Sequence, residues 1–173
     1  MRLAVRTFTL AVAATAPLVA QAPASQRGTV SQMIGATEVE VVYSRPVARG
    51  RALFGALVPY GEVWTPGANK ATTVEVSRDV TIEGESLAGG KYSLWTIPGE
   101  TEWTIILSRQ WDAWHVRYPE GQDALRVVVK PTSGMHMETL AIYFPVVGPD
   151  SATMHVHWGT TMVPIRIGAP PGA

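Results

Sequence analysis

A regular alternation of apolar and polar side chains is the feature that most constrains how this chain folds. Val39, Val41 and Tyr43 fall on one face of an extended chain. Glu38 and Glu40 fall on the other face. Successive side chains of a β-strand point to opposite sides, so this period of two predicts a strand with one buried face. The same period recurs in residues 71–77, 80–83 and 125–130.

Two further segments, 102–108 and 139–147, are apolar on both faces, which is typical of central or doubly covered strands. Residues 108–121 are expected to form a loop followed by a strand. Glycine-containing and proline-containing turns separate the runs, at intervals of about 10–12 residues. The pattern predicts an all-β fold: a single-domain antiparallel β-sandwich, or a barrel-like sandwich, over residues 25–167.

The first 24 residues have the layout of a secretory signal peptide. Arg2 and Arg6 precede an uncharged run, and the small residues Ala22 and Ala24 suit cleavage after Ala24. The apolar run is short for a membrane span, although an uncleaved anchor is the alternative. We therefore expect a periplasmic or secreted protein with no membrane span after cleavage. Residues 168–173 are expected to form a disordered tail.

Charge and cysteine content exclude several classes of protein. The chain has 14 basic and 14 acidic residues, so it lacks the net positive field that nucleic-acid binding needs. Removal of Arg2 and Arg6 with the signal leaves 12 basic against 14 acidic residues, a net charge of −2. The absence of cysteine excludes disulfides, cysteine-ligated metals and a cysteine nucleophile.

One segment, residues 44–70, breaks the alternation with three prolines and four glycines. Loops of this length are usually functional or disordered. Its apolar side chains argue against disorder, because they would be left in water. We expect a long ordered loop packed across one end or face of the sandwich. Its charges are Arg45, Arg49, Arg51 and Lys70 against Glu62 alone.

Short motifs along the chain resemble those of one bacterial family. They are YSRP (43–46), GR (50–51), FG (54–55), LVPYG (57–61), VW (63–64), GAN (67–69), AT (71–72), YSL (92–94), IP (97–98), WT (103–104) and WG (158–159). The chain resembles the family domain of unknown function twenty-nine-eleven over about residues 26–167. The resemblance implies an exported all-β domain and assigns no activity. Thr65 and Pro66 stand where that family commonly has an Arg-Thr pair.

The long loop also carries the candidate ligand-binding residues. Guanidinium groups bind carboxylate or phosphate as a fork, and they stack on aromatic rings. The alternative is that the arginines hydrogen-bond loop carbonyls or pair with Glu62, which would pin the segment in place. The candidates are Arg45 and Arg51 as anion or carbonyl partners, Tyr60 and Trp64 as stacking surfaces, and Asn69 and Lys70 as polar contacts.

The other chemical patterns predict neither a metal site nor a catalytic residue. His155 and His157 would point the same way on a strand, but a third ligand would have to come from a distant segment. The pair is expected on the solvated face, opposite the apolar residues that alternate with it. Ser86 lacks the spacing of a nucleophile elbow. Of the six tryptophans, Trp111 and Trp114 are expected to be exposed.

These observations favour an exported, non-catalytic β-sandwich that binds a small anionic or glycan-like ligand or an envelope partner, without a cofactor. The alternative is a hydrolase acting on envelope or extracellular polymers through the same loop. Its candidate general acid or base in that loop, among Asp, Glu and His, is Glu62. A structural partner module would instead present an exposed apolar patch or an unpaired edge strand. The oligomeric state stays open.

Overall fold

The computed structural model describes residues 24–170. The predicted signal peptide therefore lies almost wholly outside the described residues. Ten strands make up the described chain: β1 (Gln26–Ile34), β2 (Thr37–Arg45), β3 (Thr72–Val76), β4 (Val80–Ile82), β5 (Glu85–Leu87), β6 (Gly90–Ile97), β7 (Trp103–Ser108), β8 (Asp123–Val129), β9 (Thr132–Val147) and β10 (Ser151–Gly168). Between residues 24 and 170 no helix is long and apolar enough to cross a membrane.

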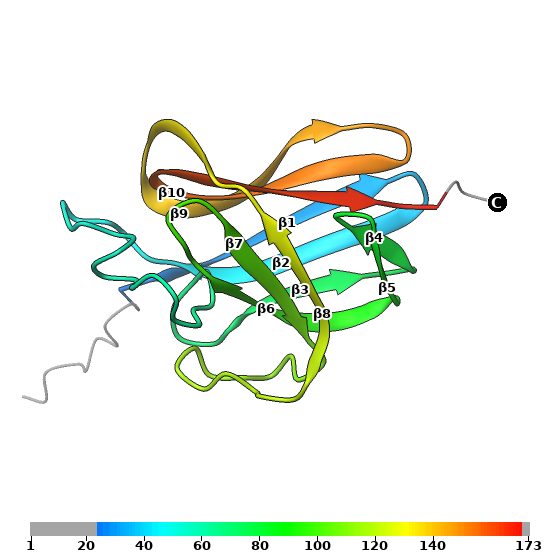
Figure 1. Cartoon of the computed structure of the whole chain (residues 1–173). Helices are drawn as coiled ribbons and strands as arrows, with labels where there is room; N and C mark the ends of the chain where they lie inside the picture. Colours follow the sequence, from blue (N-terminus) through cyan, green and yellow to red (C-terminus); the bar gives the residue numbers. More distant parts are fainter. Residues whose placement is uncertain (1–23, 171–173) are drawn as a thin grey trace, which may run out of the picture.

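The strands form two antiparallel sheets that pack face to face (Figure 1). One sheet has six strands in the order β1-β2-β3-β6-β7-β8, and the other has four in the order β5-β4-β10-β9. Neither sheet closes on itself. The predicted all-β sandwich is therefore confirmed, in its open form and not as a barrel.

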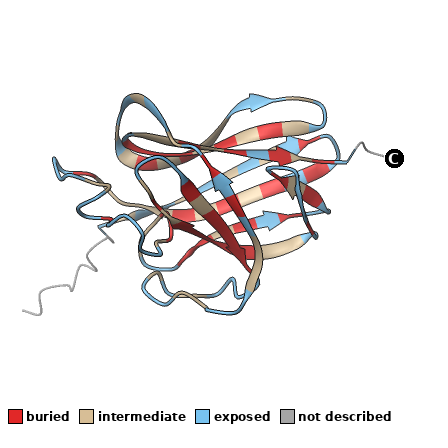
Figure 2. Ribbon diagram, viewed as in Figure 1, coloured by how far each residue is buried: buried red, intermediate tan, exposed pale blue. Residues whose placement is uncertain are grey.

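The alternation seen in the sequence builds the core between the sheets. Val39 and Val41 of β2 are fully buried, whereas Glu38, which precedes Val39 on the same strand, is exposed. Leu140 and Ile165 come from the four-stranded sheet and belong to the same continuous apolar cluster. Figure 2 shows these buried positions as bands across both sheets. Burying a Val, Leu or Ile side chain contributes about 1.5–3 kcal/mol, so this cluster is the main source of stability.

A second, smaller core lies on the outer face of the six-stranded sheet. Trp95 of β6 and Ile106 of β7 are buried there, at 1% and 0% exposure. The loop of residues 109–122 covers them, and its Tyr118 ring lies edge-on to Trp95 with 5.4 Å between ring centroids. This cover explains why 102–108 is apolar on both faces. The expected strand within 108–121 does not form, because this stretch is held as a loop over the sheet.

The first strand of the β9–β10 hairpin is longer than the segment predicted from the sequence. β9 starts at Thr132 instead of 139, and β10 is paired to it with three irregularities of register. Such bulges bend a strand and interrupt its period of two. β10 extends through Gly168, and Ala169 is buried and donates its N–H to Asp150 O at 2.7 Å. The ordered chain therefore continues past the boundary expected at 168.

The long loop, residues 44–70, is ordered and crosses one end of the sandwich, as Figure 1 shows in teal. Val47 bridges to Thr139 of β9. Trp64 and Thr96 of β6 exchange two backbone hydrogen bonds, at 2.8 and 2.7 Å. The loop is thus tied to both sheets, in agreement with the prediction of an ordered loop.

Candidate functional site

The two arginine candidates of the loop hydrogen-bond to backbone carbonyls. Arg45 Nε donates to Leu140 O at 3.0 Å. Arg51 Nε donates to Ala48 O at 2.8 Å, and its Nη2 donates to Val47 O at 2.6 Å. These are the contacts of the structural interpretation, and they fix the start of the loop against itself and against β9. A ligand role for either arginine stays a prediction.

Glu138 of β9 anchors the same turn from the side of the four-stranded sheet. Its Oε1 accepts the backbone N–H of Arg49 at 2.7 Å, and its Oε2 lies 2.8 Å from His136 Nε2. The hydrogen bond with His136, followed by that from Arg49, holds the pKa of Glu138 below its usual value. The anchoring contacts therefore favour the ionised carboxylate.

Trp64 lies within an aromatic cluster at the end of the sandwich. Its ring stacks on Trp158 with centroids 6.1 Å apart and 11° between the planes. Trp103 meets it edge-on at 6.4 Å, and Phe54 does so at 5.8 Å. In this cluster the Trp64 ring points inward and covers the end of the core. It does not place this ring at either of the recesses described below.

Buried hydrogen bonds of Thr65 position the last part of the loop. Thr65 is fully buried: its Oγ1 donates to Leu94 O at 2.7 Å and accepts the N–H of Thr72 at 3.1 Å. Asn69 then takes a left-handed backbone conformation, with φ of 64°, which Asn tolerates better than most residues. This turn brings Asn69 and Lys70 alongside residues 113–115, to which the backbone bonds.

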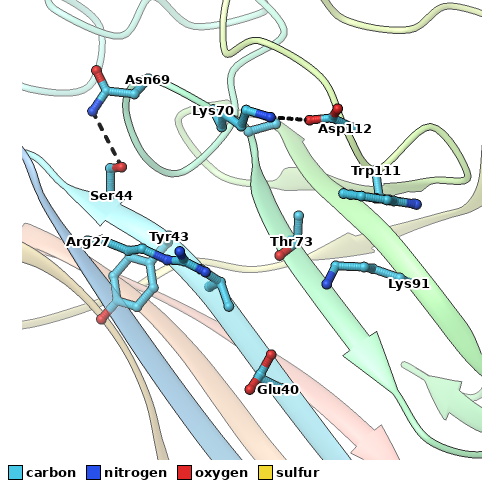
Figure 3. Close-up of a pocket in the computed structure, with 12 residues that line it drawn as sticks. Arg27, Glu40, Tyr43, Ser44, Asn69, Lys70, Thr73, Lys91, Trp111 and Asp112 are labelled. Carbon is cyan, nitrogen blue, oxygen red and sulfur yellow. Dashed lines mark hydrogen bonds and ion pairs between the residues drawn. The ribbon is translucent and has the colours of Figure 1, made fainter.

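Asn69 and Lys70 line a groove of about 450 Å³ on the outer face of the six-stranded sheet. The floor comes from outward-facing side chains of four adjacent strands, β1, β2, β3 and β6. The loop 109–122 forms the opposite wall with Trp111 and Asp112. Figure 3 shows the labelled lining residues: Arg27, Glu40, Tyr43, Ser44, Asn69, Lys70, Thr73, Lys91, Trp111 and Asp112.

Two ion pairs and one cation–π contact shape this groove. Lys70 Nζ lies 2.5 Å from Asp112 Oδ1, which closes one end between the two loops. Lys91 Nζ lies 2.9 Å from Glu75 Oε2 and 5.2 Å from the centre of the Trp111 ring. Nearly half of Trp111 is still exposed, at 46%, so the ring remains open to a ligand. The predicted exposure of Trp111 and Trp114 is confirmed.

Two charged side chains in the groove are left without a partner. Arg27 and Glu40 form no side-chain hydrogen bond or ion pair with any residue between 24 and 170. In Figure 3 the Arg27 side chain extends across β2 toward Thr73, and the Glu40 carboxylate lies farther along β2. An unpaired guanidinium and an unpaired carboxylate on one open surface can bind groups of opposite character on one ligand.

The structure divides the six candidates of the sequence. It brings Asn69 and Lys70 into the groove, and it places Arg51 and Tyr60 at a separate recess at the loop end of the sandwich. Arg45 and Trp64 line neither. Sequence reasoning missed Arg27, Glu40, Thr73 and Lys91 as partners of one site, since only strand register brings them together. The signal in the sequence that could have grouped these residues is that each lies on the polar, outward-facing side of its strand.

The expectation that His155 and His157 lie on a solvated face is wrong for His157, which is buried, and His155 is half-buried. His157 is only 4% exposed. Its Nε2 donates to Met135 O at 3.0 Å, and its Nδ1 accepts from the Tyr143 hydroxyl at 3.0 Å. His155 Nδ1 is buried and has no partner within residues 24–170. Burial, and then the nearby His157, lower the pKa of His155.

Neither a metal cluster nor a buried acid emerges from the described chain. Between residues 24 and 170 no three His, Asp or Glu side chains gather closely enough to hold a metal ion. Glu62, the acid on which the hydrolase alternative depended, is exposed and lines neither the groove nor the end recess.

Comparison with known proteins identifies a family. The sequence model of a family described as "Protein of unknown function (DUF2911)" matches residues 25–167. No curated protein and no solved structure matches the chain.

Proposed function

Because the chain belongs to this family of proteins of unknown function, whose description names no activity, we propose a function from the groove itself. The protein is a non-catalytic binding module that holds a small acidic carbohydrate on the outer face of its six-stranded sheet. The volume of about 450 Å³ lies within the usual range for small-molecule sites. The observation that carries the proposal is that one groove is lined by the unpaired Arg27 on one side and by the exposed ring of Trp111 on the other.

The charges of the groove favour a ligand with one negative group. Lys70 pairs with Asp112 and Lys91 pairs with Glu75, so Arg27 is the cation left to bind an anion. A guanidinium binds a carboxylate through two parallel hydrogen bonds. The ligand carboxylate therefore lies on Arg27.

The remaining groups favour hydroxyls and a ring over a bare inorganic anion. Glu40 accepts hydrogen bonds and would repel a second negative charge, while Thr73 can donate or accept. The Trp111 face supports a sugar ring through its apolar side. Phosphate or sulfate would use Arg27 and leave the other three side chains without a role.

The same arrangement argues against turnover of the ligand. A general acid at neutral pH needs a carboxyl group shielded from water. Asp112 is exposed, with 52% of its side chain accessible, and is paired with Lys70. Glu40 lies on the sheet surface opposite its register partner Glu75, and the two nearby carboxylates, Glu75 and Asp112, are held in ion pairs with lysines, whereas a glycosidase uses two carboxyl groups that flank the scissile bond.

Binding of glucuronate, followed by calorimetry and by the indole signal of Trp111 in NMR spectra, tests this proposal. We expect Arg27→Gln to weaken glucuronate about tenfold or more, since a charge-assisted hydrogen bond contributes about 1.5–3 kcal/mol. Glucose, which lacks the carboxylate, should bind the wild type about as weakly as glucuronate binds that variant.

Arg166→Gln is the matched control, because Arg166 is an exposed arginine on the other sheet. It should leave glucuronate binding unchanged. Equal affinity for glucose and glucuronate, or equal loss in the Arg27 and Arg166 variants, would contradict the proposal.

A further inference from the structure

The long loop encloses a second recess, at the end of the sandwich. It consists of two adjoining hollows of about 290 and 230 Å³. Both are lined by Phe54, Tyr60, Thr160 and Thr161, so they form one continuous cleft. We call this the end cleft; it shares no lining residue with the groove on the sheet face.

The floor of the end cleft is aromatic, but only part of it is accessible. Trp103 and Trp158 contribute to the lining, yet they are 1% and 3% exposed. Phe54 packs edge-on against both, with centroids 4.8 and 6.3 Å away. Besides the exposed imidazole of His136, the rings that a ligand can reach are therefore Phe54, which is half-buried, and Tyr60, which is 41% exposed.

The rim of the end cleft holds polar groups with unused hydrogen-bonding capacity. Two nitrogens of Arg51 donate to the carbonyls of Ala48 and Val47, which fixes the plane of its guanidinium group. Its third nitrogen, Nη1, has no acceptor among the described residues. Within that same range, the hydroxyls of Tyr60, Thr160 and Thr161 also have no partner. A fixed cation and free hydroxyls around an apolar floor are typical of a ligand site.

We propose that the end cleft is a second binding site, specific for a small aromatic carboxylate. The ligand ring packs edge-to-face against Phe54 and Tyr60, which extends the geometry already present in the cluster. Its carboxylate accepts hydrogen bonds from Arg51 Nη1 and from a threonine hydroxyl. Each hollow is small for a ligand site, which matches a single ring with one charged group.

The chemistry of the cleft disfavours the two obvious alternatives. A sugar ring stacks best on a flat, open tryptophan face, and both tryptophans here are buried. An inorganic phosphate prefers several converging N–H donors and would leave the Phe54 ring in contact with water. The acidic carbohydrate proposed for the sheet-face groove therefore does not suit this cleft.

An NMR titration of backbone amides with benzoate tests the inference. Benzoate should shift the amides of Phe54, Tyr60, Thr160 and Thr161 in a saturable way. Benzyl alcohol, which lacks the charge, and cyclohexanecarboxylate, which lacks the aromatic ring, should each bind several-fold more weakly. The absence of saturable shifts, shifts confined to Lys91 and Trp111, or equal binding of cyclohexanecarboxylate would overturn it.

Variants separate the two sites and guard against loss of the fold. Arg51→Ala removes both the cation and a loop contact, so Tyr60→Ala is the primary variant, because Tyr60 is exposed. We expect it to weaken benzoate about fivefold or more, as loss of an aromatic contact of about 1 kcal/mol or more would do, with an unchanged melting temperature.

Trp111→Ala is the reciprocal control. It should weaken glucuronate and leave benzoate binding unchanged. Benzoate binding that survives Tyr60→Ala but is lost in Trp111→Ala would refute the end cleft while leaving the sheet-face groove in place.

Discussion

At the scale of single residues, Arg51 shows how one side chain can serve the fold before any ligand. Two of its nitrogens hold the turn at residues 47–51 together. Arg51→Ala should lower the melting temperature by about 3–6 °C, because two hydrogen bonds to a charged group are lost in a domain of this size. Differential scanning calorimetry measures this. An unchanged melting temperature would show that the arginine is not a structural clamp.

His155 makes the stability of the protein sensitive to mild acid. Its pKa is lowered in the folded state, chiefly by burial, so the unfolded chain takes up a proton first as the pH falls below 6.5. The contribution of the neutral ring is complete above that pH and is lost as the pH falls toward the folded pKa. His115, whose two ring nitrogens are buried without partners among the described residues, acts in the same direction through burial.

Urea unfolding at pH 7.5 and at pH 5.5 measures this effect. The wild type should be less stable at the lower pH, and His155→Asn should show a smaller difference between the two. An unchanged difference in that variant would mean that His155 is not the origin of the pH dependence.

At the scale of elements, the loop 109–122 connects the small outer core to the groove. Tyr118 packs on Trp95, and its hydroxyl lies close to Asp123 and Arg126 at the start of β8. Trp111 of the same loop is a wall of the groove. We therefore expect the packing under the loop to influence the shape of the groove.

Tyr118→Ala tests this coupling. The variant should lose about 1–3 kcal/mol of unfolding free energy through the Trp95 contact and the freed polar groups. It should also weaken glucuronate, although Tyr118 does not line the groove. Tyr118→Phe keeps the ring and should keep most of the affinity. Wild-type glucuronate affinity in the alanine variant would show that the wall does not depend on this contact.

The strands whose faces differ in polarity were predictable from the sequence, and the others were not. β2, β3, β4 and β8 alternate because one face meets the core and the other meets water. β6 has no such alternation, since Trp95 on its outer face is buried under a loop that is distant in sequence. Bulges around Gly159, with φ of 60°, hide the period of β10.

The candidate site was predictable only in part, for a related reason. The segment containing Asn69 and Lys70 stood out as a long break in the alternation that is rich in proline and glycine. Arg27, Glu40 and Lys91 are separated along the chain and meet only through the pairing of β1 with β2, β2 with β3, and β3 with β6. Strand order is a property of the folded sheet, and alternation alone does not determine it.

At the scale of the whole molecule, the long loop of residues 44–70 contributes side chains to two recesses of different chemistry. The groove combines unpaired charges with an exposed tryptophan, while the end cleft combines a fixed arginine with Phe54 and Tyr60. The chain has no cysteine, so burial in the two cores and the pinned loop maintain this arrangement without disulfides. Binding by residues that the sheets hold rigidly needs little reorganisation.

Export of the whole chain is a prediction that rests on the sequence of residues 1–24. Cleavage after Ala24 should give a mature protein that begins at Ser25, directly before β1 (Gln26–Ile34). Expression of the full chain in a bacterium, followed by fractionation and N-terminal sequencing, measures this. Recovery of the uncleaved chain in the cytoplasm would contradict the export prediction.

The most direct measurement of the central claim is a crystal structure of the protein grown with glucuronate. The account predicts a sugar ring on Trp111, its carboxylate paired with Arg27, and a hydroxyl on Glu40 or Thr73. Glucuronate bound only in the end cleft, or a groove that stays empty at saturating glucuronate, would contradict it.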